Sequence, residues 1–240
     1  MGRPSRKIIV IVAVVLFSVS WGSEISHAAA ITLYNTGVDD SGALLPGGAI
    51  DPHYSLSSYI LVDPPYTPPP TNPPNVYAST DGQWPVSEGL WMLNGPNSKW
   101  ISTQDIIQIT IATGYYYYRT TFDLTGFDAR TALINGNWST DNIGVDILLN
   151  NSSTGNSIND TWSFTSFHPF SITTGFVTGI NTLDFVVFND GLASGLRVEL
   201  AGTADLYCDP HHPVPEPSTM LLLGSGLAGL VGYGRRRLKK

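Results

Sequence analysis

An aromatic residue lies close to polar planar side chains in the middle of the chain, at Trp138, Asp141 and Asn142. An indole offers a broad apolar face, and a carboxylate or amide beside it can hydrogen-bond to hydroxyl groups. A sugar ring needs both kinds of contact, so we predict a glycan-binding site at these three residues. Trp91 and Trp100 are alternative aromatic residues for such a site. The competing interpretation is that the tryptophans fill the core of a domain without disulfide bonds.

Metal ligands are suggested in the turn-rich loop that contains Asp39 and Asp40, and alternatively at Asp141. Their carboxylates are the hard oxygen ligands that Ca²⁺ prefers, so Ca²⁺ is the one cofactor left open. The Asp-x-Asp-x-Asp-Gly pattern of a dedicated calcium loop is absent. Cys208 lies close to His211 and His212, but this spacing matches no known metal site.

Residues for catalysis are scarce. His53 and His168 are the only histidines between residues 31 and 206. Neither a Gly-x-Ser-x-Gly nor a His-Glu-x-x-His motif occurs. We therefore predict that the protein is not an enzyme. The alternative is a secreted carbohydrate-active enzyme, because many acidic residues could supply a pair of carboxylates.

Charge is distributed unevenly along the chain, which has 240 residues with 12 Lys+Arg and 19 Asp+Glu. Most of the cations lie in the first seven and the last six residues. The segment 31–215 keeps 4 Lys+Arg against 17 Asp+Glu, a net charge of −13. Such a segment repels nucleic acid, so we predict no nucleic-acid partner.

The strongest strand signal is the segment Tyr115–Leu124. Its alternation places one set of side chains on one face and the other set on the opposite face. The first set is Tyr116, Tyr118, Thr120, Phe122 and Leu124, and the second is Tyr115, Tyr117, Arg119, Thr121 and Asp123. A half-buried strand is expected there.

Similar alternation recurs at 143–149, 182–189 and 195–206, separated by turns rich in Gly, Asn and Asp. Further strands are expected at 31–35 and 162–170. This spacing predicts an all-β fold, an antiparallel β-sandwich or jelly roll, over residues 31–206. A proline-rich loop at 63–74 cannot join a sheet interior, and we expect it on the surface.

The N-terminus has the three parts of a secretory signal peptide over residues 1–30. Cations in the first seven residues precede the apolar run 8–19, which predicts a signal helix, and Ala28–Ala30 supplies small residues. We predict cleavage after Ala30, with cleavage after Ala28 as the alternative. A short linker, 207–213, follows the β domain.

The C-terminal segment 214–240 also has three parts in a fixed order. Pro215, Glu216 and Pro217 interrupt any helix, an apolar run follows, and Arg235, Arg236 and Arg237 open a basic cluster. We predict a short transmembrane helix over 218–234, slightly shorter than the roughly 20 residues that a bilayer needs. The basic cluster belongs on the cytoplasmic side. A plain C-terminal membrane anchor is the alternative.

This three-part tail resembles the PEP-CTERM protein-sorting signal. The resemblance covers about a tenth of the chain. It implies that an exosortase, a membrane protease-transpeptidase, processes the protein near Pro215–Pro217. It also implies a membrane-anchored precursor that becomes a surface or extracellular protein of a Gram-negative bacterium that makes exopolysaccharide.

The stretch from Tyr115 to Asn151 resembles the sugar-binding jelly rolls of the galactose-binding-like fold, through its strand–turn–strand order and the Trp138–Asn142 segment. With the sorting signal, it suggests a non-enzymatic surface or matrix protein that binds extracellular polysaccharide. A purely structural or adhesive protein that binds no sugar is a further alternative.

Overall fold

The computed structural model describes residues 28–61, 75–105 and 111–207. The signal segment before residue 28, the proline-rich loop, Cys208 and the whole sorting tail with its expected helix 218–234 lie outside the described residues. None of the helices within the described ranges has the length and hydropathy needed to span a bilayer.

The regular structure of the described chain is almost entirely β, with eleven strands and two short 3-10 turns, η1 and η2. The elements are β1 Ala28–Ile31, β2 Ile50–Leu61, β3 Asn75–Ala78, β4 Ile101–Ser102, β5 Gly114–Asp123, η1 Ala129–Thr131, β6 Leu133–Asp141, β7 Ile143–Leu149, β8 Ser152–Ser153, η2 Ser163–Thr165, β9 His168–Ile172, β10 Ile180–Asn189 and β11 Gly195–Asp205. The predicted all-β antiparallel class is confirmed.

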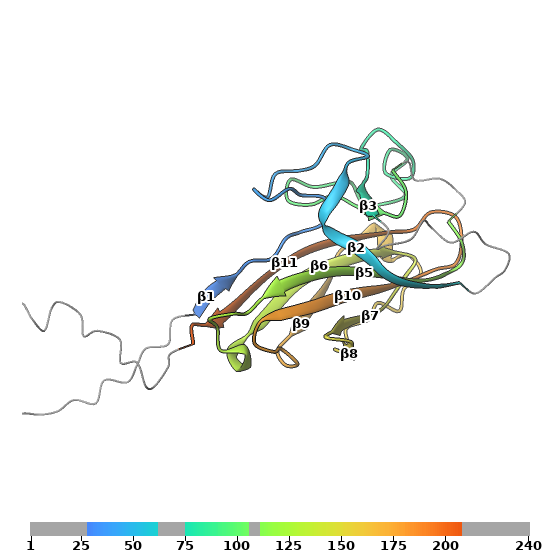
Figure 1. Ribbon diagram of the computed structural model, residues 1–240. Coiled ribbons are helices and arrows are strands. Elements are labelled where there is room, and N and C mark those ends of the chain that lie inside the picture. The colour runs from blue at the N-terminus through green and yellow to red at the C-terminus, as the bar shows by residue number, and fades with distance from the viewer. Residues whose placement is uncertain (1–27, 62–74, 106–110, 208–240) are drawn as a thin grey trace, which may run out of the picture.

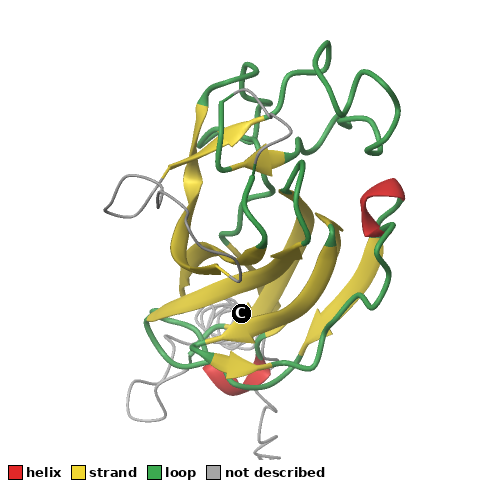
Figure 2. Cartoon of the chain, turned by 90° about the vertical axis from the view of Figure 1, so that its right-hand side faces the viewer, coloured by secondary structure: helices red, strands yellow, loops and turns green. Residues whose placement is uncertain are grey.

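The strands form one curled antiparallel sheet in the order β8-β7-β10-β5-β2-β3-β4-β11-β6-β9, with β1 paired to β11. In Figure 1, β2 leaves the layer of β5 and rises toward β3. Figure 2 shows the long strands curving around one another, with loops and short strands gathered beyond one end of them. The two halves of the sheet therefore face each other across a shared core.

Aromatic contacts join the two halves. The ring of Phe185 in β10 lies 5.8 Å from that of Trp138 in β6, centroid to centroid. It is also 5.8 Å from the ring of Phe170 in β9. Because β10 belongs to one half of the sheet while β6 and β9 belong to the other, these rings fill the space between the halves.

The alternation predicted for Tyr115–Leu124 is confirmed in β5 and the residue that follows it. Tyr116, Tyr118, Thr120, Phe122 and Leu124 are all buried. On the other face Thr121 and Asp123 are exposed, and Arg119 pairs with the buried carboxylate of Asp184 at 2.7 Å. The predicted division into two faces is therefore confirmed, and the structure shows that the set beginning with Tyr116 is the buried one.

Two predicted strands differ from the observed ones. The first strand lies at 28–31 rather than 31–35, because Ala28–Ile31 pairs with the end of β11, Gly202–Asp205. Cleavage after Ala30 would thus leave only Ile31 of β1. The aromatic segment 162–170 begins with the turn η2, and strand β9 starts only at His168. Aromatic content alone did not distinguish a packed loop from a strand.

Candidate functional site

A pocket of about 200 Å³ opens at the end of β6, where four separate parts of the chain meet. Its wall combines aromatic rings with carboxyl and amide groups. It is lined by Trp84, Pro85, Leu90, Trp91, Asp141, Asn142, Trp162, Phe164, Asp190, Gly191, Leu192 and Ala193. We call it the Trp162 pocket.

Trp162 gives this pocket an accessible aromatic surface. Its side chain is 64% exposed, and its ring lies 5.4 Å from that of Phe164, which supports it from one side. Leu192 is also largely exposed. Trp84 is half-buried and packs on the small apolar cluster around Trp91. Exposing an apolar ring to water costs free energy that is recovered when a ligand or partner buries the ring. Exposed apolar side chains grouped in one wall are typical of a contact surface.

Asp141 brings a buried carboxyl group to the same pocket. Its Oδ2 accepts a 2.8 Å hydrogen bond from Trp91 Nε1. Burial raises the pKa of Asp141 to about 7, against the lowering effect of that hydrogen bond, and the nearby charge of Asp190 raises it slightly further. The carboxyl can therefore donate or accept a hydrogen bond near neutral pH.

Asn142 follows Asp141 through a cis peptide bond. Its Oδ1 accepts a 3.0 Å hydrogen bond from the backbone N–H of Asp190, which ties the end of β6 to the loop after β10. Asp190 itself is exposed. The pocket thus holds an amide, a carboxyl group of raised pKa and an exposed carboxylate beside an open indole.

The position of the tryptophan pair behind the pocket depends on the first residue of β11, Gly195. The rings of Trp91 and Trp100 lie 4.4 Å apart, and Trp100 Nε1 donates to Met92 O at 2.8 Å. A Cβ on Gly195 would come within 2.9 Å of Trp91 Cζ3 and 3.1 Å of Ile101 O. Glycine at the start of β11 therefore leaves the room that the Trp91 ring needs.

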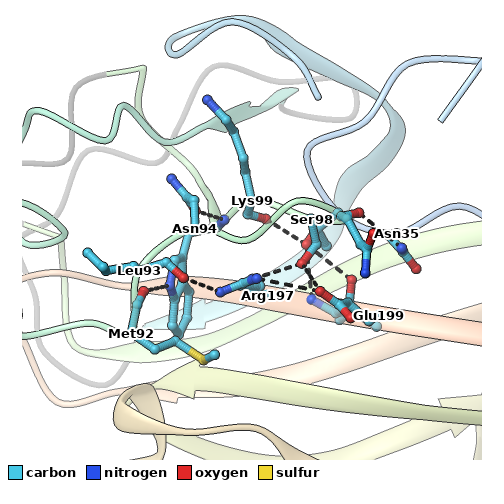
Figure 3. Close-up of polar contacts among 12 residues, drawn as sticks. Asn35, Met92, Leu93, Asn94, Ser98, Lys99, Arg197 and Glu199 are labelled. Carbon is cyan, nitrogen blue, oxygen red and sulfur yellow. Dashed lines mark hydrogen bonds and ion pairs between the residues drawn. The ribbon is translucent and has the colours of Figure 1, made fainter. Parts of the chain in front are cut away.

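Arg197 fastens the loop that carries Trp91 to the sheet (Figure 3). Its guanidinium donates to Leu93 O and, at 2.8 Å, to Ser98 Oγ. It also lies 3.5 Å from Glu199 Oε1, and the Phe167 ring packs 4.8 Å beneath it. Burial lowers the pKa of Arg197, and the carboxylate of Glu199 opposes this effect in part.

The structure brings two of the three predicted glycan-binding residues to the pocket and moves the third away. Asp141 and Asn142 line it, whereas Trp138 is only 1% exposed and packs in the core against Phe185. An indole with no open face cannot stack on a ligand, so the role predicted for Trp138 is corrected to core packing. Trp91 and Trp100 are buried as well. For all three, the competing core interpretation holds.

The proposed metal ligands lie elsewhere, in the loop before β2. Asp39 Oδ1 accepts hydrogen bonds from Ser41 N, Ser41 Oγ and Ala43 N at 2.7 to 3.0 Å, and these lower its pKa. Asp40 lies 3.5 Å from His53 Nε2. In the described part of the chain, no three His, Cys, Asp or Glu side chains come together to hold a metal. The geometry accounts for Asp39 as a loop-forming residue.

The predicted site omits Trp162, the exposed tryptophan that lines the pocket. The aromatic content of 162–170 predicts a strand that includes Trp162, although this residue directly follows the polar run Asn159-Asp160-Thr161. A large aromatic side chain after such a run fits an exposed loop, and this signal was available. Asp190 and Leu192 carry no such signal, because only the fold brings them beside Asp141.

Comparison with known families identifies the tail. Residues 213–237 match the PEP-CTERM protein-sorting motif. The match includes Pro215, Glu216 and Pro217 and reaches Arg235–Arg237, so the predicted sorting signal is confirmed. The chain therefore carries a signal that implies export and a membrane-anchored precursor, with an exosortase as the processing partner.

Among solved structures, the chain shows a weak similarity to CBM35 from Paenibacillus barcinonensis, at 12% sequence identity and a TM-score of 0.27. The similarity covers 62% of this chain and 93% of that one. No curated protein matches the chain significantly.

Proposed function

We propose that this chain is an exosortase-sorted surface protein whose β-sandwich domain binds extracellular polysaccharide in the Trp162 pocket, without catalysing a reaction. The sorting signal supports delivery to the cell surface. The observation that carries the binding proposal is the exposed indole of Trp162 in a pocket that also holds Asp141, Asn142 and Asp190.

The physical argument rests on the two faces of a sugar. The C–H face of a pyranose ring is apolar and loses water favourably against an indole. Its hydroxyl groups need planar acceptors and donors at the ring edge, which carboxyl and amide groups supply. With 17 acidic residues against 4 basic ones over 31–215, the domain favours a neutral polysaccharide over an anionic one.

A second candidate function, glycoside cleavage, has one observation in its favour. The pocket contains two carboxyl groups, and the raised pKa of Asp141 is a property of a general acid. Against it, Asp141 is 6% exposed and one of its oxygens is taken by Trp91. We favour binding because a catalytic acid must reach the glycosidic oxygen, whereas binding can rest on the exposed indole of Trp162 and the exposed carboxylate of Asp190.

The test uses the full-length protein in detergent on an array of neutral and anionic glycans, with Trp162→Ala and Ile180→Ala as matched variants. Both side chains are 64% exposed, but Ile180 lies on β10, away from the pocket. If the Trp162 pocket binds sugar, the wild type and Ile180→Ala should retain neutral glycans. Trp162→Ala should lose most of this retention. Equal retention by Trp162→Ala, or no retained sugar at all, would overturn the proposal.

Two further arms separate the alternatives. Retained oligosaccharides recovered at unchanged length support binding, whereas shortened products abolished by Asp141→Asn would establish the enzyme. Retention repeated with a calcium chelator asks whether Ca²⁺ takes part, with Asp39→Asn and Asp40→Asn testing the predicted ligands. Retention of a surface protein but of no glycan would identify the adhesive alternative.

A further inference from the structure

A second hollow lies on the outward face of β6, β9 and β11, and it is larger than the Trp162 pocket. Its volume is about 740 Å³. The side chains that matter for binding are polar and come from Asn35, Asn135, Asn137, Asn156, Ser171 and Glu199. We call this hollow the asparagine groove.

Strand register arranges the groove in two rows. Asn137 of β6 pairs with Glu199 of β11 and with Pro169 of β9. One step along the same face, Asn135 pairs with Ala201 and Ser171. Positions two apart on a strand are about 6.6 Å from each other, so the two amides are neighbours above the sheet. The side chains of Ala201 and Ser171 are small, so they leave the space beside Asn135 open at the base of the groove.

The four asparagines divide into two that build the groove and two that are free to bind. Asn35 Oδ1 accepts from Leu200 N and Asn156 Nδ2 donates to Ser171 O, so these amides form its walls. Asn135 and Asn137 are exposed, and their amides make no hydrogen bond to any other described residue. Each therefore offers a donor and an acceptor to a ligand.

The groove is separate from the Trp162 pocket although both lie along β6. Asp141 is about 13 Å further along the strand than Asn137. Between them, Ser139 is buried against η2, with its Oγ donating to Ser163 O, and Arg197 is buried between the Phe167 ring and the loop at Leu93. A ligand in one site does not occupy the other.

We propose that the asparagine groove is a second contact surface for neutral glycan, gripping chain hydroxyls through Asn135 and Asn137. Paired amides suit vicinal hydroxyls because each amide can donate to one oxygen and accept from another. Glu199 already accepts from Ser98 Oγ at 2.8 Å and from Arg197 at 3.5 Å, which leaves its charge largely compensated. The inference deepens the proposed function by adding a site, and the groove can be tested apart from Trp162.

The experiment is affinity electrophoresis of the full-length protein in gels that contain galactomannan or mixed-linkage β-glucan. The groove variant is Asn135→Ala/Asn137→Ala and the pocket variant is Trp162→Ala. The matched control is Ser58→Ala/Thr121→Ala, two exposed polar residues on β2 and β5 in the other half of the sheet. Removing two hydrogen-bonding amides should weaken the groove's affinity about tenfold. Unchanged Tm values show that each variant folds.

Greater mobility of the groove variant, with unchanged mobility of the control, supports the proposal. If the groove variant is slowed as much as the wild type while Trp162→Ala runs free, the groove inference is overturned and the pocket proposal stands. If the groove variant loses retardation and Trp162→Ala does not, the groove stands and the pocket proposal falls. A wild type that neither polysaccharide retards overturns both.

Discussion

Trp91 Nε1 donates a hydrogen bond of 2.8 Å to Asp141 Oδ2, across 50 positions of sequence. The bond joins the loop before β4 to the last residue of β6 and closes the back of the Trp162 pocket. It also keeps a carboxyl group in a place where water cannot solvate its charge. Stability and the pocket's polarity therefore depend on the same pair of side chains.

Asp141 should make the protein less stable as the pH rises. Its pKa in the folded protein is raised to about 7, whereas an unfolded aspartate titrates near 3.9. Between these values the folded state holds a proton that the unfolded state releases, so the free energy of unfolding falls with rising pH, by roughly 4 kcal/mol at most. Urea denaturation of the wild type and Asp141→Asn at pH 5 and pH 8 measures this, and the variant should show a smaller drop.

Other carboxyl groups set the background of that experiment. Burial also raises the pKa of Asp51. The free energy of unfolding of Asp141→Asn should therefore still fall somewhat as the pH rises. Asp39, Asp123 and Asp128 have pKa values lowered by side-chain hydrogen bonds, so their contribution is lost only as pH falls into the acid range. An equal pH dependence in the wild type and Asp141→Asn would contradict the assignment.

Replacing Arg197 by Met should destabilise the protein by about 3 kcal/mol, because it leaves buried acceptors without their partner. Arg197 is 2% exposed and holds Leu93 O and Ser98 Oγ. Chemical denaturation provides the measurement. Arg130→Met is the control: Arg130 pairs with Asp128 at 2.7 Å, but its side chain is 85% exposed, and no measurable change is expected. Similar losses in both variants would argue against a fastening role.

A methyl group at Gly144 should disturb the core at Trp138. The added Cβ would lie 2.6 Å from Trp138 Cη2. Overpacking of this kind costs about 1–3 kcal/mol. We expect Gly144→Ala to lower Tm and to alter the near-ultraviolet circular dichroism of the tryptophans. Gly82→Ala, where nothing lies within 4 Å of the added Cβ, should leave both unchanged.

Mass spectrometry of the exported protein tests the two terminal signals. We expect a chain that begins at Ile31 and that has lost the basic cluster Arg235–Arg237, because an exosortase acts near the Pro215–Pro217 motif. A variant with Glu216→Ala should keep the tail and accumulate in the membrane. An intact basic cluster on the wild-type surface protein would contradict processing and favour a plain anchor.

Patterns within short stretches of sequence were enough to predict the β class and the position of several strands. The alternation of Tyr115–Leu124 divided the side chains of β5 correctly between two faces, because exposure along a strand follows the side-chain period. The prediction for Trp138 was wrong because it rested on neighbouring residue types and not on which face of the strand the indole takes. The prediction of a strand at Trp162 was wrong because it rested on aromatic content, and this loop packs against the sheet without joining it.

The sequence by itself determined the sorting tail and the β class, because both depend on the order or period of nearby residues. The tertiary structure alone decided which side chains share a site. The Trp162 pocket draws on residues 84–91, 141–142, 162–164 and 190–193, and the asparagine groove depends on the register of three strands. Strand pairing is set by packing of the whole core, so contacts between such distant segments leave no signal in any one of them.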